Sequence, residues 1–198
     1  MDLPKTFDEF VDARKQGFIR AKEFKDNGGK LAGCLCSYTP QEVLDAAAIA
    51  TVGLCGTSNE TIPDAEKVLP KNLCPLIKST YGFAYSEKCP YTYFSDIIIG
   101  ETTCDGKKKM YELMSDFKEV YVMELPNRQS EYGLELWRKE IIRFKEYLEE
   151  RFHIVITDEM VKKAIHLSNE NRRAVQRLYG LMKLDPPRTG AFSDSVWK

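Results

Sequence analysis

The sequence predicts an α/β protein in which a mostly parallel sheet is flanked by helices, with a helix before it and a helical segment after it. Four short apolar runs, each bounded by turn residues, alternate with stretches of helical periodicity, and this alternation is typical of βαβ units. The chain has 198 residues, of which 43% are hydrophobic and 30% charged. This length suits one ordinary domain with room for a small helical lobe.

The N-terminal segment, residues 1–29, is predicted to be helical. Arg14 is the one polar residue that interrupts its apolar stripe, and Gly28 and Gly29 are expected to end the helix. The stripe must pack against another part of the protein, because its members share one helix face. They are Phe7, Phe10, Val11, Phe18, Ala21 and Phe24.

The segment 30–130 is predicted to be the α/β domain. Its four apolar runs predict strands, and helical stretches begin at residues 39 and 105. Thr39 is expected to be the N-cap of the first of these helices, with Pro40 at the first helical position and Glu42 at the third. The first strand must then end near Tyr38. The four runs are 30–38, 50–57, 96–103 and 119–126.

Residues 131–184 are predicted to form a helical segment, and 185–198 a disordered tail that contains Pro186 and Pro187. The only further strand candidate is the brief run 153–157. The first predicted helix carries Leu134, Trp137, Ile141, Phe144 and Leu148 on one face. The second opens near Thr157 and carries Met160, Ala164, Leu167, Ala174, Leu178 and Leu181.

Charge and hydropathy exclude several classes of partner. Twenty-nine basic residues stand against thirty acidic ones, so the net charge of −1 supplies no field that would gather nucleic acid or an acidic membrane. The apolar runs are short, and Asp2 lies where a signal peptide would carry basic residues. We therefore expect a soluble, cytoplasmic protein that binds neither nucleic acid nor membrane.

The positions of the cysteines indicate a site. Cys36, Cys55 and Cys104 are predicted at the C-terminal ends of the first three strands, which converge on one crevice in a parallel sheet. Cys74 and Cys89 each precede a proline, as N-cap residues do, and the positive end of a helix favours a thiolate. A ligand role is favoured for Cys36, Cys74 and Cys104. For Cys55 and Cys89, a ligand and a core residue are equally compatible with the pattern.

The remaining candidates are weaker. Cys34 is expected to be a core residue, and His153 and His166 look like ordinary helix residues. A widely spaced set of cysteines fits iron and sulfur better than zinc, which generally takes close CxxC or HxxxH pairs. The lysines 107–109 oppose the dipole of their predicted helix; a nearby anion would explain them, although solvated lysines are the more frequent explanation.

Three segments carry a resemblance to a known family: CSYTPQEVLDAA (36–47), LPKNLCPLIKSTYGFA (69–84) and KCPYTYFSDIIIGETTCDGKKKMYEL (88–113). They resemble the 2-hydroxyacyl-CoA dehydratase component family, and the motifs LCGTS, NLCPLIKS and ETTCDGKKKM are most similar to its double-cubane-cluster branch. The resemblance covers residues 7–184 and the N-terminal half of the family pattern only.

The resemblance implies a flavodoxin-like α/β fold, anaerobic chemistry, and an iron–sulfur cluster, 4Fe-4S or double-cubane, bound in segment 30–130. It implies Cys36, Cys74 and Cys104 as ligands, from the YTP, NLCP and TCDGKK motifs, and Cys55 and Cys89 less firmly. It also implies a separate ATP-dependent iron–sulfur activator protein that supplies electrons.

Three functions are compatible with these features. The first is an iron–sulfur redox component of a dehydratase or of a small-molecule reductase. The second is a truncated, non-catalytic α/β module with idle cysteines, and the third is a CoA-ester-binding module in which lysines 107–109 contact phosphates. Family members continue into a second α/β lobe, so we expect the open crevice to pair with a second copy or with a separate second-lobe chain.

Overall fold

The computed structural model describes residues 5–184, with side chains from residue 12 onward except at position 14. It contains one sheet of four parallel strands in the order β2-β1-β3-β4, which is the beginning of the flavodoxin-like order. The predicted fold class and all four predicted strands are confirmed. The strands are shorter than the apolar runs: β1 (Lys30–Cys34), β2 (Ile49–Gly53), β3 (Ile97–Glu101) and β4 (Val120–Met123).

The strand order creates a point at which the chain reverses direction across the sheet. β1 pairs with β2 on one side, with Lys30 opposite Ile49, and with β3 on the other, with Ala32 opposite Ile97. The chain therefore moves from β1 to one side of the sheet, and later returns to the other side. Open α/β sheets bind ligands at such a switch point, beyond the C-terminal ends of the strands. Here it lies between β1 and β3.

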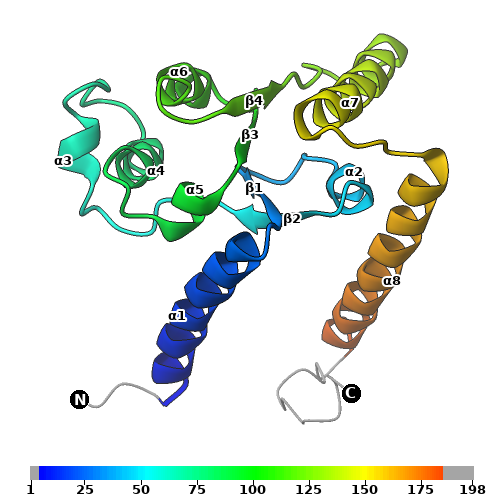
Figure 1. Cartoon of the computed structure of the whole chain (residues 1–198), viewed down its shortest axis with the longest axis horizontal. Coiled ribbons are helices and arrows are strands. Elements are labelled where there is room, and N and C mark those ends of the chain that lie inside the picture. Colours follow the sequence, from blue (N-terminus) through cyan, green and yellow to red (C-terminus); the bar gives the residue numbers. More distant parts are fainter. Residues whose placement is uncertain (1–4, 185–198) are drawn as a thin grey trace.

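Helices cover both faces of the sheet, because successive strand side chains point to opposite faces. Ile97 and Ile99 belong to one buried cluster and Ile98 to the other. The first cluster is completed by α2 (Gln41–Ala46), α7 (Glu131–Phe152) and α8 (Asp158–Met182), which lie on the right of Figure 1. The second is completed by α3 (Ile62–Ala65), α4 (Pro75–Tyr85) and α6 (Asp105–Met114), on the left.

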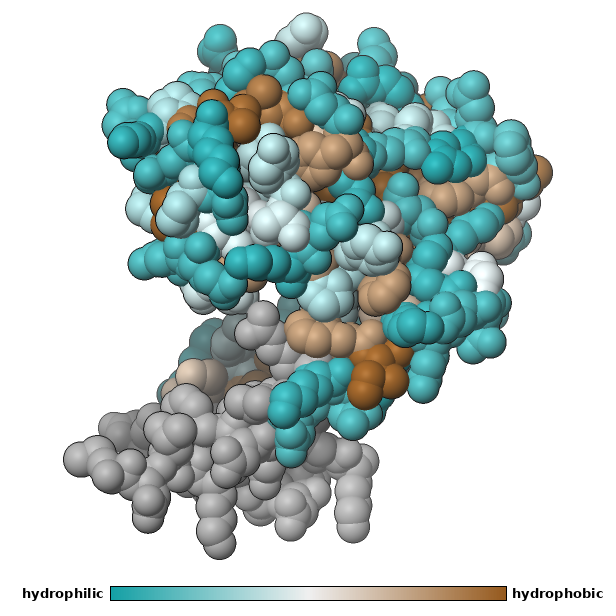
Figure 2. Space-filling view, turned by 60° about the vertical axis from the view of Figure 1, so that its left-hand side comes forward, coloured by the Kyte–Doolittle hydropathy of each residue, from teal (hydrophilic) through white to brown (hydrophobic). Residues whose placement is uncertain are grey.

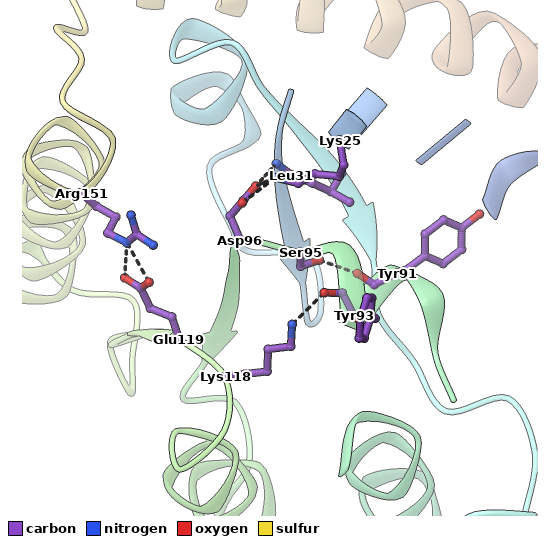
Figure 3. Close-up of polar contacts among 9 residues, drawn as sticks. All are labelled: Lys25, Leu31, Tyr91, Tyr93, Ser95, Asp96, Lys118, Glu119 and Arg151. Atoms are coloured by element: carbon purple, nitrogen blue, oxygen red, sulfur yellow. Dashed lines mark hydrogen bonds and ion pairs between the residues drawn. The ribbon is translucent and has the colours of Figure 1, made fainter. Parts of the chain in front are cut away.

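Ion pairs tie the helices to the N-terminal edge of the sheet (Figure 3). Asp96, next to β3, accepts hydrogen bonds from Lys25 Nζ at 2.6 and 2.7 Å and from the backbone nitrogen of Leu31 at 2.7 Å. Lys25 belongs to α1 (Lys5–Asp26), the predicted N-terminal helix, which Gly28 follows at a φ of +79°. Arg151 of α7 pairs with Glu119 at 2.7 Å. A further helix, α5 (Pro90–Phe94), packs against α1 through Tyr91.

The C-terminal helices are confirmed, but the run 153–157 is not a strand. It forms the turn between α7 and α8, with His153 in the left-handed conformation and Thr157 as the N-cap of α8. Residues 170–184 are exposed throughout, so the apolar face of α8 is covered only near its start, where Ala164 is buried. The predicted tail, 185–198, lies outside the described residues.

The surface of the described part is mixed. On the face shown in Figure 2, hydrophobic side chains form separate areas among hydrophilic ones. None of the helices within residues 5–184 combines the length and the apolar character that a membrane span requires.

Candidate functional site

Cysteines occupy the C-terminal edge of the sheet, as the strand prediction requires. Cys36 comes two residues after β1, Cys55 two residues after β2, and Cys104 three residues after β3. All three side chains are exposed. Because β2, β1 and β3 are adjacent and parallel, these cysteines leave the sheet at the same edge. Their role as ligands stays a prediction.

Two further cysteines begin helices. Cys74 is the N-cap of α4 and Cys89 the N-cap of α5, and each is followed by proline in the first turn, as predicted. Cys74 is exposed and Cys89 is half-buried. Neither side chain makes a capping hydrogen bond, so both sulfurs remain available to other partners.

Cys34 is the core residue that the sequence predicts. It is 4% exposed, and burial raises the pKa of its thiol to about 11, with the nearby charge of Glu101 acting in the same direction. A thiol in this environment stays protonated at neutral pH and is a poor nucleophile or metal ligand.

The first turn of α6 contacts Cys36 and the residue before Cys74, and it begins after Cys104. Cys104 is the N-cap of α6, and Lys107 Nζ contacts the sulfur of Cys36. A Cβ placed on Gly106 would lie 2.9 Å from Leu73, the neighbour of Cys74. Residues from three separate parts of the sequence therefore meet at this turn.

The three lysines at this turn differ in their contacts. Burial alone would lower the pKa of Lys107, but its hydrogen bond to Cys36 and the neighbouring negative groups raise it. Lys108 and Lys109 instead pair with Asp105 at 3.0 Å and with Glu112 at 2.7 Å, and these pairs are exposed. Lys107 thus contacts a cysteine. Lys108 and Lys109 are solvated, which is the more frequent explanation for a run of lysines.

The loop between β1 and α2 depends on a residue that the sequence analysis missed. Glu101, the last residue of β3, is completely buried, and its Oε1 accepts hydrogen bonds from the nitrogens of Tyr38 and Thr39 at 2.6 and 2.7 Å. The predicted capping role of Thr39 is wrong: Pro40 is the N-cap of α2, and the Thr39 hydroxyl donates to Glu101 instead, at 3.2 Å. An acid two residues after three consecutive isoleucines, within a predicted buried strand, was the signal that could have identified Glu101.

A cavity of about 660 Å³ lies beside the switch point. Tyr38, Thr102 and Thr103 line it from the ends of β1 and β3, Arg128 lines it from the loop between β4 and α7, and Trp137 lines it from α7. This volume lies within the range of small-molecule sites, which combine apolar walls with a few polar groups.

The described residues do not form a finished metal site. Within residues 5–184, no three His, Cys, Asp or Glu side chains are close enough together to hold a metal ion. Thiol groups are the donors that iron–sulfur clusters require, so the residue types fit such a cluster.

The comparisons with known proteins decide the family. Residues 36–195, which are most of the chain, match the family described as 2-hydroxyglutaryl-CoA dehydratase, D-component. The chain belongs to this family. The predicted resemblance is therefore confirmed, and the matched segment contains the cysteines at positions 36, 55, 74, 89 and 104.

Several relatives of this dehydratase family member are named as parts of larger enzymes. YjiM of Escherichia coli K12, named as a dehydratase subunit, is 51% identical over 94% of this chain and 49% of its own length. The (R)-phenyllactyl-CoA dehydratase beta subunit of Clostridium sporogenes is 30% identical over 85% of this chain and 45% of its own. A benzoyl-CoA reductase subunit of Thauera aromatica is 26% identical over the same shares. The chain spans about half the length of these curated relatives.

Proposed function

We propose that this chain is an iron–sulfur redox component of a 2-hydroxyacyl-CoA dehydratase or of a related reductase. The observation that carries the proposal is the meeting of three cysteine-bearing segments at the first turn of α6. Cys104 begins that turn, Lys107 contacts Cys36, and Gly106 packs against the residue before Cys74. The names of the relatives support the same class of reaction.

In this proposal Cys36, Cys74 and Cys104 hold the cluster, and Cys55 and Cys89 are further candidate ligands. A bound cluster, 4Fe-4S or double-cubane, supplies one-electron transfer. Cys74 and Cys104 lie at helix N-termini, whose partial positive charge stabilises an anionic sulfur. The ammonium of Lys107 offsets negative charge at Cys36. Segment 30–130 is then the cluster-binding domain.

The partners are part of the same proposal. We propose that an ATP-dependent iron–sulfur activator protein supplies the electrons, and that the substrate is a CoA thioester, as the names of the relatives suggest. The cavity beside Tyr38 is large enough for the acyl part of such a substrate. The exposed apolar residues of α8, among them Val175, Tyr179 and Met182, suit contact with a second copy or a second-lobe chain. A cytoplasmic location, which is reducing, suits free cysteines.

Iron and acid-labile sulfide analysis of anaerobically purified protein tests the proposal. We expect a brown protein with about four irons per chain, the content of one cubane cluster. Cys36→Ser, Cys74→Ser and Cys104→Ser should each lower the iron content after reconstitution. Cys34→Ser is the matched control and should leave it unchanged. Full iron retention in all three variants, with unchanged absorption spectra, would contradict the ligand assignment.

A second candidate function is a non-catalytic α/β module with idle cysteines. The observation that favours it is the lack of a preformed metal-binding group among residues 5–184. A folded, colourless protein that takes up no iron under anaerobic reconstitution would support this candidate over the first.

A further inference from the structure

Glu101 links two segments that flank the switch point between β1 and β3, namely helix α6 and the loop 36–39. Its backbone nitrogen donates to the hydroxyl of Tyr111 on α6, at 3.2 Å. Its side chain reaches the loop 36–39, where Oε1 accepts one hydrogen bond from Tyr38 and two from Thr39. The carboxylate is completely buried, and within the described residues its Oε2 is the only buried side-chain nitrogen or oxygen atom without a partner.

The residue that this arrangement fixes is Cys36. Its φ of 78° is left-handed, a conformation that a non-glycine residue keeps only where surrounding contacts hold it. The nitrogens bound by Glu101 come two and three residues after Cys36, and the Cys36 sulfur contacts Lys107 on α6. Glu101, the Cys36 loop and α6 thus form a closed ring of contacts around the switch point.

We propose that Glu101 is the positioning residue for Cys36: it holds the loop 36–39 against β3 and keeps the sulfur beside Lys107. The carboxylate is suited to this task because it accepts several hydrogen bonds and donates none. The link to redox chemistry rests on the proposed function, whereas the positioning itself can be tested on protein without metal.

Two measurements on the full chain without metal test the positioning. Amide hydrogen exchange reports whether the nitrogens of Tyr38 and Thr39 are held. The alkylation rate of Cys36, mapped by mass spectrometry, reports the surroundings of its sulfur, and the exposed Cys55 in the same molecule is the internal reference. Glu101→Leu removes the hydrogen-bond acceptor. Glu101→Asp keeps a carboxyl group, but its side chain is one methylene shorter and its oxygens no longer reach the loop.

In both variants we expect exchange at Tyr38 and Thr39 to accelerate about tenfold or more, because a lost hydrogen bond of this kind corresponds to at least that factor. The amide of Ile98, which donates to Glu119 at the other end of β3, should not change. Alkylation of Cys36 should change several-fold relative to Cys55, because release of the loop moves its sulfur away from Lys107 and changes the access of the reagent. Glu101→Gln, which keeps one acceptor oxygen, should restore part of both properties.

Two control variants separate position from charge. Lys107→Met removes the contact to Cys36 and should change the alkylation of Cys36 without accelerating exchange at Tyr38 and Thr39. Thr39→Val removes the hydroxyl donor but keeps both backbone donors, so it should have a smaller effect than Glu101→Leu. If Glu101→Leu does not fold, Glu101→Asp decides. Wild-type exchange at Tyr38 and Thr39, or wild-type alkylation of Cys36, in a folded variant of either kind would overturn the proposal.

Iron analysis of the same proteins separates this inference from the proposed function. If the wild type takes up no iron but Glu101→Leu releases the loop, the proposed function fails and the positioning role stands. If the wild type binds iron and neither Glu101→Leu nor Glu101→Asp changes exchange, alkylation or the absorption spectrum, the positioning role fails alone.

Discussion

The two edges of the sheet are held in different ways. At the N-terminal edge, Asp96 accepts three hydrogen bonds from Lys25 Nζ and the Leu31 nitrogen, and Glu119 pairs with Arg151 (Figure 3). At the C-terminal edge, Cys36 has a left-handed backbone, and the buried Glu101 has one oxygen without a partner among the described residues. Partnered polar groups stabilise the first edge. Strained and under-satisfied groups at the second are typical of functional sites.

The residue types at the two edges, and their exposure, differ in the same way. Loops at the C-terminal edge carry Cys36, Cys55 and Cys104, with exposed sulfurs that contribute little to packing. The N-terminal edge instead ties α1 to the sheet through the partly buried Lys25–Asp96 pair, and α7 through the exposed Arg151–Glu119 pair. We therefore expect substitutions at the N-terminal edge to affect stability, and substitutions of the exposed cysteines to affect the site.

The largest effect should come from Asp96→Ala. The change removes the partner of Lys25 and leaves the nitrogen of Leu31 without its acceptor, so we expect a loss of about 2–3 kcal/mol in the free energy of unfolding. Urea denaturation would measure it. Cys104→Ser, an exposed change at the opposite edge, is the control and should cost far less. Equal losses at both positions would remove the contrast between the edges.

Gly100→Ala should destabilise the C-terminal edge of the sheet through a steric clash in the core. A Cβ at this position would lie 2.5 Å from the ring carbon Cζ of Tyr111, and the ring is buried and unable to move freely. We expect the free energy of unfolding to fall by about 2 kcal/mol, which is typical of overpacking. Exchange of the Glu101 amide, which donates a hydrogen bond to the Tyr111 hydroxyl, should also become faster. Thermal unfolding and amide exchange measure the two effects. A fully stable variant with a protected Glu101 amide would show that Tyr111 does not brace this edge.

The raised pKa of Cys34 predicts a loss of stability in alkaline solution. Burial raises this pKa from 9.0 to about 11, so between these pH values the unfolded thiol ionises while the folded thiol keeps its proton. The unfolded state then binds fewer protons, and stability falls as pH rises, by about 1.4 kcal/mol at pH 10.

Cys34→Ala isolates this contribution from the other groups that titrate in the same range. Urea denaturation at pH 8 and pH 10 should show a smaller loss in Cys34→Ala than in the wild type. Equal losses would mean that the Cys34 thiol is less buried in solution than its 4% exposure indicates.

The smallest effect should come from Lys108→Ala. Lys108 pairs with Asp105, whose side chain is 99% exposed, and solvent screens such pairs strongly. We expect no measurable change in thermal unfolding. A clear loss of stability would show that charge at the start of α6 supports the fold, and the comparison of the two edges would need revision.

Local signals in the amino-acid sequence were enough to predict the strands and the main helices of this protein. Short apolar runs bounded by turn residues identified all four strands, and Thr157 and Gly28 marked the ends of neighbouring helices. These signals are local, because strand and helix periodicity and capping depend on residues a few positions apart. The motifs around Cys36, Cys74 and Cys104 likewise identified the family, since a motif is a local property of the chain.

The residues that surround Cys36 could not be predicted in this way, because they come from distant parts of the chain. Thr39 has the local sequence of an N-cap, yet its hydroxyl and its nitrogen bind Glu101, a residue 62 positions away. Lys107, 71 positions from Cys36, contacts the cysteine, while its neighbours Lys108 and Lys109 face solvent. Such contacts depend on strand order and register, because these bring β1 and β3 together. A buried carboxylate then takes the donors of the nearest loop, since leaving them without partners would cost more than a weakened helix cap.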